Sequence, residues 1–388
     1  MGHPESIDMS MIQRSLRHLA AQFTFAVLSA ALVVTGLAPV AADAATKART
    51  ASREESMSLD ALYDQALAEG GELVVYAGGD VASQQDGTVK AFQARFPKIR
   101  LTMVVDYSKF HDVRVDNQLA TGTLVADVVQ LQTLQDFARW KRQDRLLPYK
   151  PAGFAKVYPD FKDPDGAWSA IGVIAFSYMV DPGAVGDATL ASPKDLADPA
   201  WRGKIASSYP NDDDAALFLY RLYAEAYGWD WIAKLATQDI QFARGTHTPG
   251  AAVRARQKAI GVAASGSLTA PATAPVQWIV AQDQPFLAWG QRAAILKDAR
   301  HPAAAKLYMN WQLSPERQQA AFNGWSVRTD INPPGGLKPI WAYPNAHVAD
   351  FAAFMADRAE VERWRQTFTL YFGEVKGEPS PGWFGLGR

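Results

Sequence analysis

The chain has 388 residues, of which 48% are hydrophobic and 20% are charged, and its formal net charge is −1. This length and balance are typical of a globular protein with two domains. Because cysteine is absent, disulfides, thiolate metal sites and a cysteine nucleophile are all excluded.

Residues 1–44 have the features of a secretory signal peptide. Arg14 and Arg17 precede an apolar run at 23–37, and a small-residue site at 42–44 follows it, which is the order of parts in a cleaved signal. The alternative is a membrane anchor. The apolar run is shorter than the ~20 residues of a membrane span, and nothing like it recurs, so we favour cleavage.

Cleavage after Ala44 predicts a periplasmic protein with a small, polar and disordered leader at residues 45–57. The mature chain would carry no net charge, so we expect no general attraction to nucleic acid or to anionic membranes. A bacterial lipid anchor requires a cysteine at the cleavage point, so the mature protein should diffuse freely. We also expect it to be a monomer.

The first part of the mature chain, residues 58–172, alternates between expected strands and expected helices. Residues 71–77, 99–106 and 126–132 are apolar or alternate as strands do, and helical patterns lie between them. This alternation predicts an α/β lobe built on a parallel sheet with helices on its faces. Ligands of such sheets bind at the carboxyl ends of the strands.

The second part repeats this alternation. Residues 168–180 form a long apolar run without helical polar positions, which predicts a strand that crosses between lobes. A second α/β lobe is expected over 173–286, with a return crossing near 285–296. Residues 287–388 then return to the first lobe and end in C-terminal helices.

Motifs for common enzyme chemistry are missing from the sequence. It has no GxSxG, HExxH, Walker or GxGxxG pattern. The four histidines after the expected signal are far apart: His111, His247, His301 and His347. We therefore expect a protein that is not an enzyme and has no cofactor, while the pattern leaves open whether a metal binds.

Three stretches resemble a known family: ADVV (126–129), DPAWRGKIA (198–206) and AAILKDARHPAAAKLYMNWQLSPERQ (293–318). Over roughly residues 59–340 the chain resembles the family-1-type extracellular solute-binding proteins of ABC importers, the group often labelled ferric-iron transporters. The resemblance implies a type II periplasmic-binding-protein fold, with two α/β lobes joined by crossing strands. It also implies closure of the lobes around one small ligand, docking on a membrane permease, and no catalysis.

Iron-binding members of that family carry a histidine or acid after the first strand, an acid after the Ala-Asp-Val strand, and adjacent tyrosines in the second lobe. In this chain Asp80 and Gln132 stand near the first two positions, and Ser265 and Ser267 stand near the third. Ferric iron prefers anionic oxygen ligands. Glutamine and serine suit hydrogen bonding instead, so we expect a polar organic solute, an oxyanion or a metal chelate.

Three consecutive acids, Asp212, Asp213 and Asp214, directly precede an apolar helical stripe that begins at Ala215. One aspartate is enough to cap a helix, an effect of about 1 kcal/mol, and three adjacent negative charges repel one another. We therefore expect Asp214 to serve the helix. Asp212 and Asp213 are expected to contact a ligand, such as a cation, a hydroxyl-rich solute or a metal.

Four further positions have a ligand-binding interpretation beside a structural one. Gly79 could bring its backbone amide close to a ligand or only form a turn, and Tyr209 could line the cleft or pack inside. Thr248 could present a hydroxyl or cap a helix, and Trp289 could stack on a ligand or belong to the core.

Two other functions remain open from the sequence. A periplasmic enzyme on the same fold could use Asp80 and Asp212 as an acid/base pair. A ligand-sensing input to a membrane receptor could also use the same two lobes.

Overall fold

The computed structural model describes residues 53–186, 190, 192–280, 283–320 and 324–378, all within one compact unit. The expected signal peptide and most of the expected leader lie outside the described residues. Residues 53–57 do not match the expectation of disorder. The Glu54 carboxylate accepts hydrogen bonds from the backbone amides of Gly153 (2.7 Å) and Ala155 (2.9 Å), so this segment packs against the first lobe.

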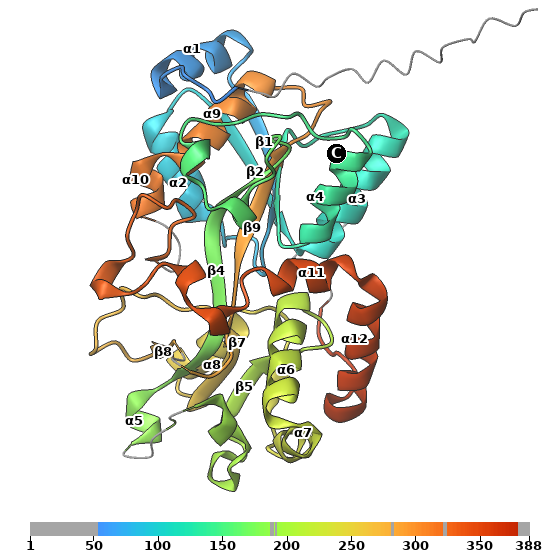
Figure 1. The fold of residues 1–388 in the computed structure, drawn as a ribbon, viewed down its shortest axis with the longest axis vertical. Helices are drawn as coiled ribbons and strands as arrows, with labels where there is room; N and C mark the ends of the chain where they lie inside the picture. The colour runs from blue at the N-terminus through green and yellow to red at the C-terminus, as the bar shows by residue number, and fades with distance from the viewer. Residues whose placement is uncertain (1–52, 187–189, 191, 281–282, 321–323, 379–388) are drawn as a thin grey trace, which may run out of the picture. The chain divides into compact units, whose positions relative to one another are not determined.

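The first lobe is a parallel sheet flanked by helices, as the sequence predicted (Figure 1). Its parallel strands are β1 (Glu72–Gly78), β2 (Arg100–Asp106) and β3 (Val128–Leu131), in the order β2-β1-β3. Its helices from this part of the chain are α1 (Leu59–Ala68), α2 (Asp86–Arg95), α3 (Ser108–Thr121) and α4 (Leu134–Arg142).

Both faces of this sheet are buried, which explains the apolar strand sequences. On one face Val75 and Val128 pack in a core with Phe92 of α2. On the other face Tyr76 and Val129 pack in a separate core that includes residues of α3 and α4. A strand covered on both sides has no need of alternating polar residues.

Two long antiparallel strands connect the lobes and lie side by side along the middle of Figure 1. They are β4 (Ser169–Val180) and β9 (Leu287–Ile295). Their pairing runs from Ser169 with Ala293 to Phe176 with Leu287, and β9 also pairs with β3. Both predicted crossing strands are therefore confirmed.

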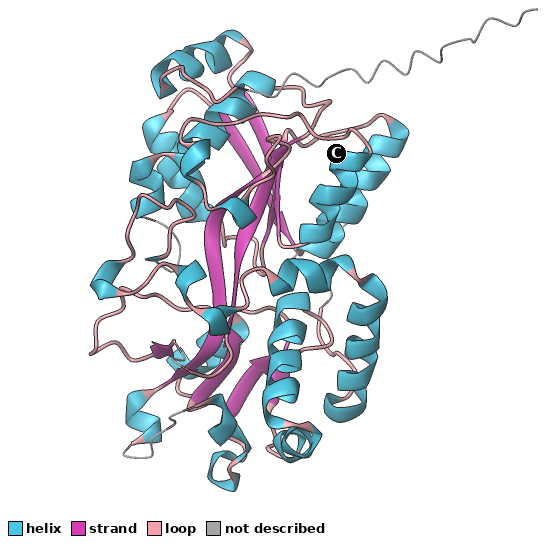
Figure 2. Ribbon diagram, in the orientation of Figure 1, coloured by secondary structure: helices cyan, strands magenta, loops and turns pink. Residues whose placement is uncertain are grey.

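The second lobe continues the same sheet beyond β4 (Figure 2). Its strands are β5 (Ile205–Ser208), β6 (Gln241–Ala243), β7 (Ile260–Ala264) and β8 (Gln277–Ile279). The nine-stranded order is β2-β1-β3-β9-β4-β7-β5-β6, with β8 paired to β4 off this path. The helices here are α5 (Pro182–Val185), α6 (Asp214–Tyr227), α7 (Trp229–Ala236) and α8 (Thr248–Arg254). The predicted two-lobed α/β fold is confirmed.

After β9 the chain visits both lobes. Helices α9 (Pro302–Leu313) and α10 (Pro315–Gln319) follow the predicted return, and α9 packs on α1. The last two helices, α11 (Asp350–Ala356) and α12 (Arg358–Phe372), instead pack on α6 of the second lobe. Short 3-10 turns lie at Phe154–Lys156, Pro159–Phe161, Pro193–Ala197, Pro199–Trp201, Pro334–Gly336, Ile340–Ala342 and Pro344–Ala346.

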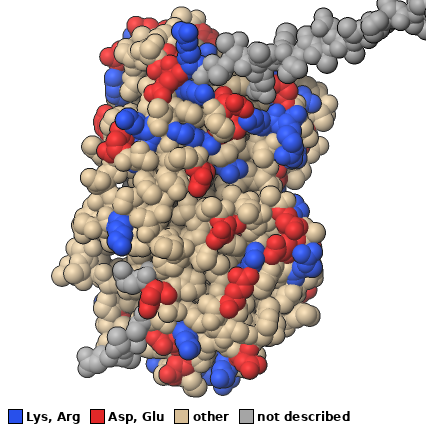
Figure 3. Space-filling model, viewed as in Figure 1, with Lys and Arg blue, Asp and Glu red and all other residues tan. Residues whose placement is uncertain are grey.

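Acidic and basic side chains are interspersed on the face shown in Figure 3, which carries no large patch of one sign. This matches a chain whose formal net charge is −1. Among the described residues, no helix is both long enough and apolar enough to cross a membrane.

Candidate functional site

A cleft of about 380 Å³ lies between the two lobes. The first lobe contributes the residues that follow β1, β2 and β3. The second lobe contributes the start of α6 and the loop before α8, and the crossing strands contribute Phe176, Trp289 and Gln291. The cleft therefore lies where the carboxyl ends of parallel strands place ligands in open α/β sheets.

Close packing explains the two glycines at the end of β1. A side chain on Gly79 would place its Cβ 2.6 Å from Cγ1 of Val105. A Cβ on Gly78 would collide with the hydroxyl of Ser108. These glycines let the first strand approach the start of α3, which brings the ends of β1 and β2 together on one wall.

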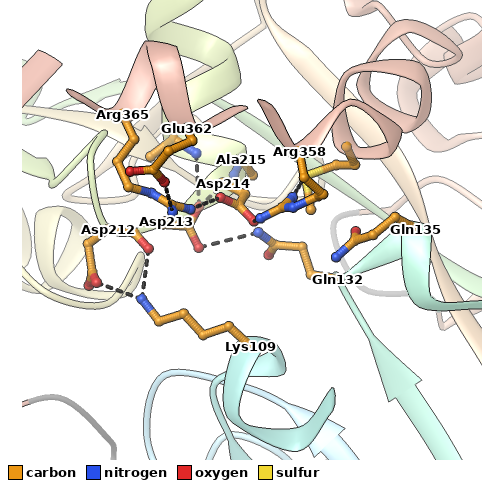
Figure 4. Close-up of polar contacts among 12 residues, drawn as sticks. Lys109, Gln132, Gln135, Asp212, Asp213, Asp214, Ala215, Arg358, Glu362 and Arg365 are labelled. Atoms are coloured by element: carbon orange, nitrogen blue, oxygen red, sulfur yellow. Dashed lines mark hydrogen bonds and ion pairs between the residues drawn. The ribbon is translucent and has the colours of Figure 1, made fainter. Parts of the chain in front are cut away.

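Asp213 caps α6. Its Oδ1 accepts hydrogen bonds from the backbone amides of Ala215 (2.9 Å) and Ala216 (2.8 Å). Its Oδ2 accepts a hydrogen bond from Nε2 of Gln132 across the cleft, at 3.3 Å (Figure 4). The capping role expected for Asp214 therefore belongs to Asp213, which also lines the cleft.

Asp212 forms an ion pair with the opposite lobe. Nζ of Lys109, on α3, lies 2.6 Å from Asp212 Oδ1 and donates to the Asp212 carbonyl at 2.8 Å (Figure 4). The ammonium also lies 5.5 Å from the ring centre of Tyr107. Nη1 of Arg244 lies 3.6 Å from the same carboxylate oxygen. Asp212 is thus held by two cations rather than left free.

Asp214 joins α6 to α12. Its carboxylate lies 2.7 Å from Nη2 of Arg365 and 3.4 Å from Nη2 of Arg358 (Figure 4). The three aspartates therefore have different main roles: Asp212 pairs with Lys109 of the opposite lobe, Asp213 caps α6, and Asp214 pairs with arginines of α12.

Asp80 makes a further polar contact between the lobes. Its Oδ2 accepts hydrogen bonds from the backbone amide (2.9 Å) and the hydroxyl (2.6 Å) of Thr246. Nδ1 of His247 lies 3.9 Å from the same oxygen. Through Asp80, Lys109 and Gln132, the first lobe makes direct polar contacts with the second.

Burial dominates the electrostatics of these acids. It raises the pKa of Asp213 from 3.8 to about 7, and the hydrogen bond from Ala216 opposes this shift. The carboxylates of Asp80 and Asp214 raise the pKa of Asp213 further by repulsion. Burial also raises the pKa of Asp80, while the hydrogen bonds from Thr246 lower it. The cleft thus holds carboxyl groups that bind protons more tightly than usual.

Six of the nine ligand-binding residues predicted from the sequence lie on the cleft wall: Gly79, Asp80, Gln132, Asp212, Asp213 and Ser265. The hydroxyl of Ser265 donates to the carbonyl of Ala175 at 3.0 Å, so this donor is already engaged.

The other three predicted residues lie elsewhere. The buried ring of Tyr209 stacks on Phe242, with ring centres 5.3 Å apart. The Thr248 hydroxyl donates to the Gly245 carbonyl at 2.7 Å, at the start of α8. Ser267 is exposed and hydrogen-bonds to Thr269. Tyr209 therefore packs inside its lobe, and Thr248 bonds at the start of a helix, which are the structural alternatives stated for these two residues.

Several wall residues are absent from the nine ligand-binding residues predicted from the sequence. Tyr107, Ser108 and Lys109 directly follow β2, and Thr133 follows β3. Tyr107, Ser108 and Thr133 belong to the strand ends where the sequence predicts ligand contacts, and Lys109 lies one residue beyond them. Arg254, on α8, is exposed and also lines the cleft.

The crossing strands form the apolar part of the wall. Trp289 is 1% exposed and packs edge-on against Phe176, with ring centres 5.1 Å apart. Its indole N–H donates to Oε1 of Gln291 at 3.2 Å. Trp289 is therefore chiefly a core residue that reaches the cleft.

No metal centre is evident in the described part of the chain, which contains no group of three or more His, Asp or Glu side chains placed to hold an ion. The acids at the cleft instead contact cations, amides and hydroxyls of the protein itself.

A family profile described as bacterial extracellular solute-binding protein matches residues 117–332, more than half of the chain. A search of curated proteins finds no match.

Many solved structures share the fold, and the three described next are each under 25% identical to this chain. Iron-bound HitA from Pseudomonas aeruginosa is 19% identical, with a TM-score of 0.60 over 76% of this chain and 99% of that one. The periplasmic binding protein AfuA from Actinobacillus pleuropneumoniae, with fructose-6-phosphate bound, is 19% identical, with a TM-score of 0.62 over 78% and 99%. The substrate-binding protein of an ABC transporter from Agrobacterium tumefaciens is 14% identical, with a TM-score of 0.64 over 78% and 94%.

Proposed function

Because the chain belongs to the bacterial extracellular solute-binding protein family, we propose that it captures one small polar solute in the cleft and delivers it to an ABC importer permease. The observation that carries this proposal is the make-up of the cleft wall. Hydrogen-bonding groups from both lobes face the same 380 Å³ space. A solute held there would contact both lobes at once.

Hinge closure would be the working motion. A ligand favours the conformation in which it makes the most contacts, so a solute that bridges the lobes stabilises the closed state. The described conformation already contains direct contacts between the lobes, including Lys109 with Asp212 and Asp80 with Thr246. The solute would add its own contacts to these.

We propose a polar organic solute or a chelate rather than bare ferric iron. The residue near the family's acidic iron ligand is Gln132, which is neutral, and its amide donates to Asp213. The residues near the tyrosine pair are Ser265 and Ser267, and Ser267 is exposed away from the cleft wall. Neither of these two positions supplies the anionic oxygen ligand that ferric iron prefers.

We propose binding rather than turnover. Asp80 and Asp212, considered above as an acid/base pair, are engaged with Thr246 and Lys109. A general base must reach a substrate proton, and these oxygens already hold other partners. We also propose that a signal peptide is cleaved and that the mature protein resides in the periplasm as a monomer.

Small-angle scattering on ligand-stripped protein tests this function. The panel would contain amino acids, sugars, sugar phosphates, polyamines, thiamine derivatives, and ferric iron with and without chelators. We expect one solute class to reduce the radius of gyration and to raise the melting temperature. At 100 times its dissociation constant a ligand adds about 2.7 kcal/mol of stability. If no solute compacts the protein, or if a bound solute is chemically converted, the proposal is wrong.

A further inference from the structure

Helix α3 carries apolar side chains on two opposite faces. On its inner face Val115 belongs to a core of the first lobe, and Leu119 packs against that core. On its outer face Val113 is 54% exposed and Phe110 is half-buried. A helix at the surface of a globular protein normally has one apolar stripe and a polar face opposite to it. The core of the first lobe therefore does not explain the second apolar face of α3.

Three side chains make up this outer surface, which we call the α3 strip: Tyr107, Phe110 and Val113. Tyr107 directly precedes α3, and its ring centre lies 6.0 Å from that of Phe110. Residues three apart on a helix are neighbours, so Val113 continues the line from Phe110. The strip thus begins at the cleft, where Tyr107 lines the wall, and leads outward to the exposed Val113.

The chain that follows α12 runs along the second lobe towards the cleft. The carbonyl of Gly373 accepts a hydrogen bond from Nδ2 of Asn211 at 2.9 Å. Four residues further on, a Cβ placed on Gly377 would lie 3.9 Å from Cδ of Arg244. Arg244 directly precedes the loop that lines the cleft before α8. The described part of the chain therefore ends beside this cleft-lining loop, at residue 378.

Contacts already described connect this point with the α3 strip. Nη1 of Arg244 lies 3.6 Å from Oδ1 of Asp212, and Nζ of Lys109 lies 2.6 Å from the same oxygen. The ammonium group of Lys109 lies 5.9 Å from the ring centre of Phe110. The strip is thus three side chains away from the residues that follow α12, although it belongs to the other lobe.

The next ten residues, 379–388, lie outside the described residues and read PSPGWFGLGR. They include three large apolar side chains, Trp383, Phe384 and Leu386. Such side chains are unfavourable in water and gain free energy when they pack against another apolar surface. The composition of this segment therefore matches the apolar character of the α3 strip.

The segment is also long enough to reach the strip. Trp383 lies six residues after Gly377, and six residues in an extended chain span up to ~20 Å. Pro379 and Pro381 favour extended backbone conformations in the first part of this stretch. The separation between Gly377 and Phe110 is bridged by the side chains of only three residues, so an extended segment covers it.

We propose that residues 379–388 dock on the α3 strip, with Trp383 and Phe384 covering Phe110 and Val113. Docking removes apolar surface of both the segment and the strip from water. The segment starts from the second lobe and the strip belongs to the first, so the docked segment joins the lobes across one side of the cleft. It would have to leave the strip before the lobes part.

Crosslinking between introduced thiols tests this contact, because the natural chain has no cysteine. The double variant Val113→Cys with Gly385→Cys is oxidised with diamide, and mass spectrometry of the unreduced digest gives the initial rate of disulfide formation. Leu370→Cys with Gly385→Cys is the matched control, since Leu370 is an exposed apolar residue of α12 and lies nearer to Gly385 along the chain. Docking raises the effective concentration of the two thiols, so we expect the disulfide at position 113 to form at least about tenfold faster.

A further variant removes the proposed anchors. Adding Trp383→Ser and Phe384→Ser to the protein with Val113→Cys and Gly385→Cys should lower its rate to that of the control. The docking is refuted if the disulfide at position 113 forms no faster than that at position 370, or if the two serines leave its rate unchanged. A disulfide formed mainly between two molecules, seen as twice the chain mass, would also refute it and would make a second copy the occupant of the strip.

Thermal unfolding of each variant confirms that it is folded. No solute is present in these measurements, so their outcome decides the docking alone. The proposed function is decided separately by the scattering panel described above.

Discussion

Replacing Asp213 by asparagine should change how the stability of the protein depends on pH. Asparagine is as good a helix cap as aspartate, so the amides of Ala215 and Ala216 keep an acceptor. The substitution removes a buried carboxyl group whose pKa is raised from 3.8 to about 7. The comparison therefore isolates one titrating group.

The raised pKa of Asp213 sets the direction in which stability changes with pH. Because the folded state binds this proton more tightly than the unfolded state, the stabilisation is complete below pH 3.8 and is lost as the pH rises through 7. Between these values each pH unit removes about 1.4 kcal/mol from the free energy of unfolding. From pH 5 to pH 8 the free energy of unfolding of the wild-type protein should therefore fall by about 2–3 kcal/mol relative to that of Asp213→Asn. Asp80 shifts in the same direction, but both proteins contain it.

Urea unfolding at pH 5, 6, 7 and 8, followed by tryptophan fluorescence, measures this difference. Asp298→Asn, in an exposed turn, is the matched control and should keep the wild-type dependence. If the difference between Asp213→Asn and the wild type is the same at pH 5 and pH 8, the carboxyl group of Asp213 is not held protonated by burial, and the reasoning fails.

Thr133→Val should stabilise the ligand-free protein by about 1 kcal/mol, because it removes a buried hydroxyl without a partner; a loss of stability in urea unfolding would mean that the hydroxyl is bonded. Lys109→Met removes the ion pair with Asp212 between the lobes. Lys109→Met should enlarge the ligand-free radius of gyration in scattering, whereas Lys234→Met, on α7, should not. Equal radii for Lys109→Met and the wild type would show that this ion pair does not hold the lobes together. Phe218→Ala should cost about 3–5 kcal/mol, because this ring is 2% exposed in the main core of the second lobe; a loss below 1 kcal/mol by urea unfolding would contradict that packing.

The fold was predictable because its strands are buried on both faces. The run that contains Val75 and Tyr76 sends neighbouring side chains into two different cores, so every position had to be apolar. The crossing strands were predictable for a similar reason, since β4 and β9 pair with each other between apolar layers.

The site was only partly predictable. Asp80 and Gln132 were found because strand ends mark the cleft. Tyr209 was misplaced because sequence gives the position of a side chain along the chain but not its direction, and this ring turns towards Phe242. The helix cap was assigned to Asp214 instead of Asp213, because two neighbouring acids at a helix start are indistinguishable without α12, whose Arg365 holds Asp214.

The packing of α11 has a consequence for how the lobes can move. This helix contacts both α6 and α4, and Leu134 of the first lobe belongs to the same apolar core as Phe351 and Met355 of α11. Separating α11 from α4 would expose apolar surface to water, at about 25 cal/mol per Å². The polar contacts elsewhere between the lobes, such as Lys109 with Asp212, can exchange their partners for water at little cost. We therefore expect the apolar seam at α11 to stay joined when the lobes part, and the polar side to open to the solute.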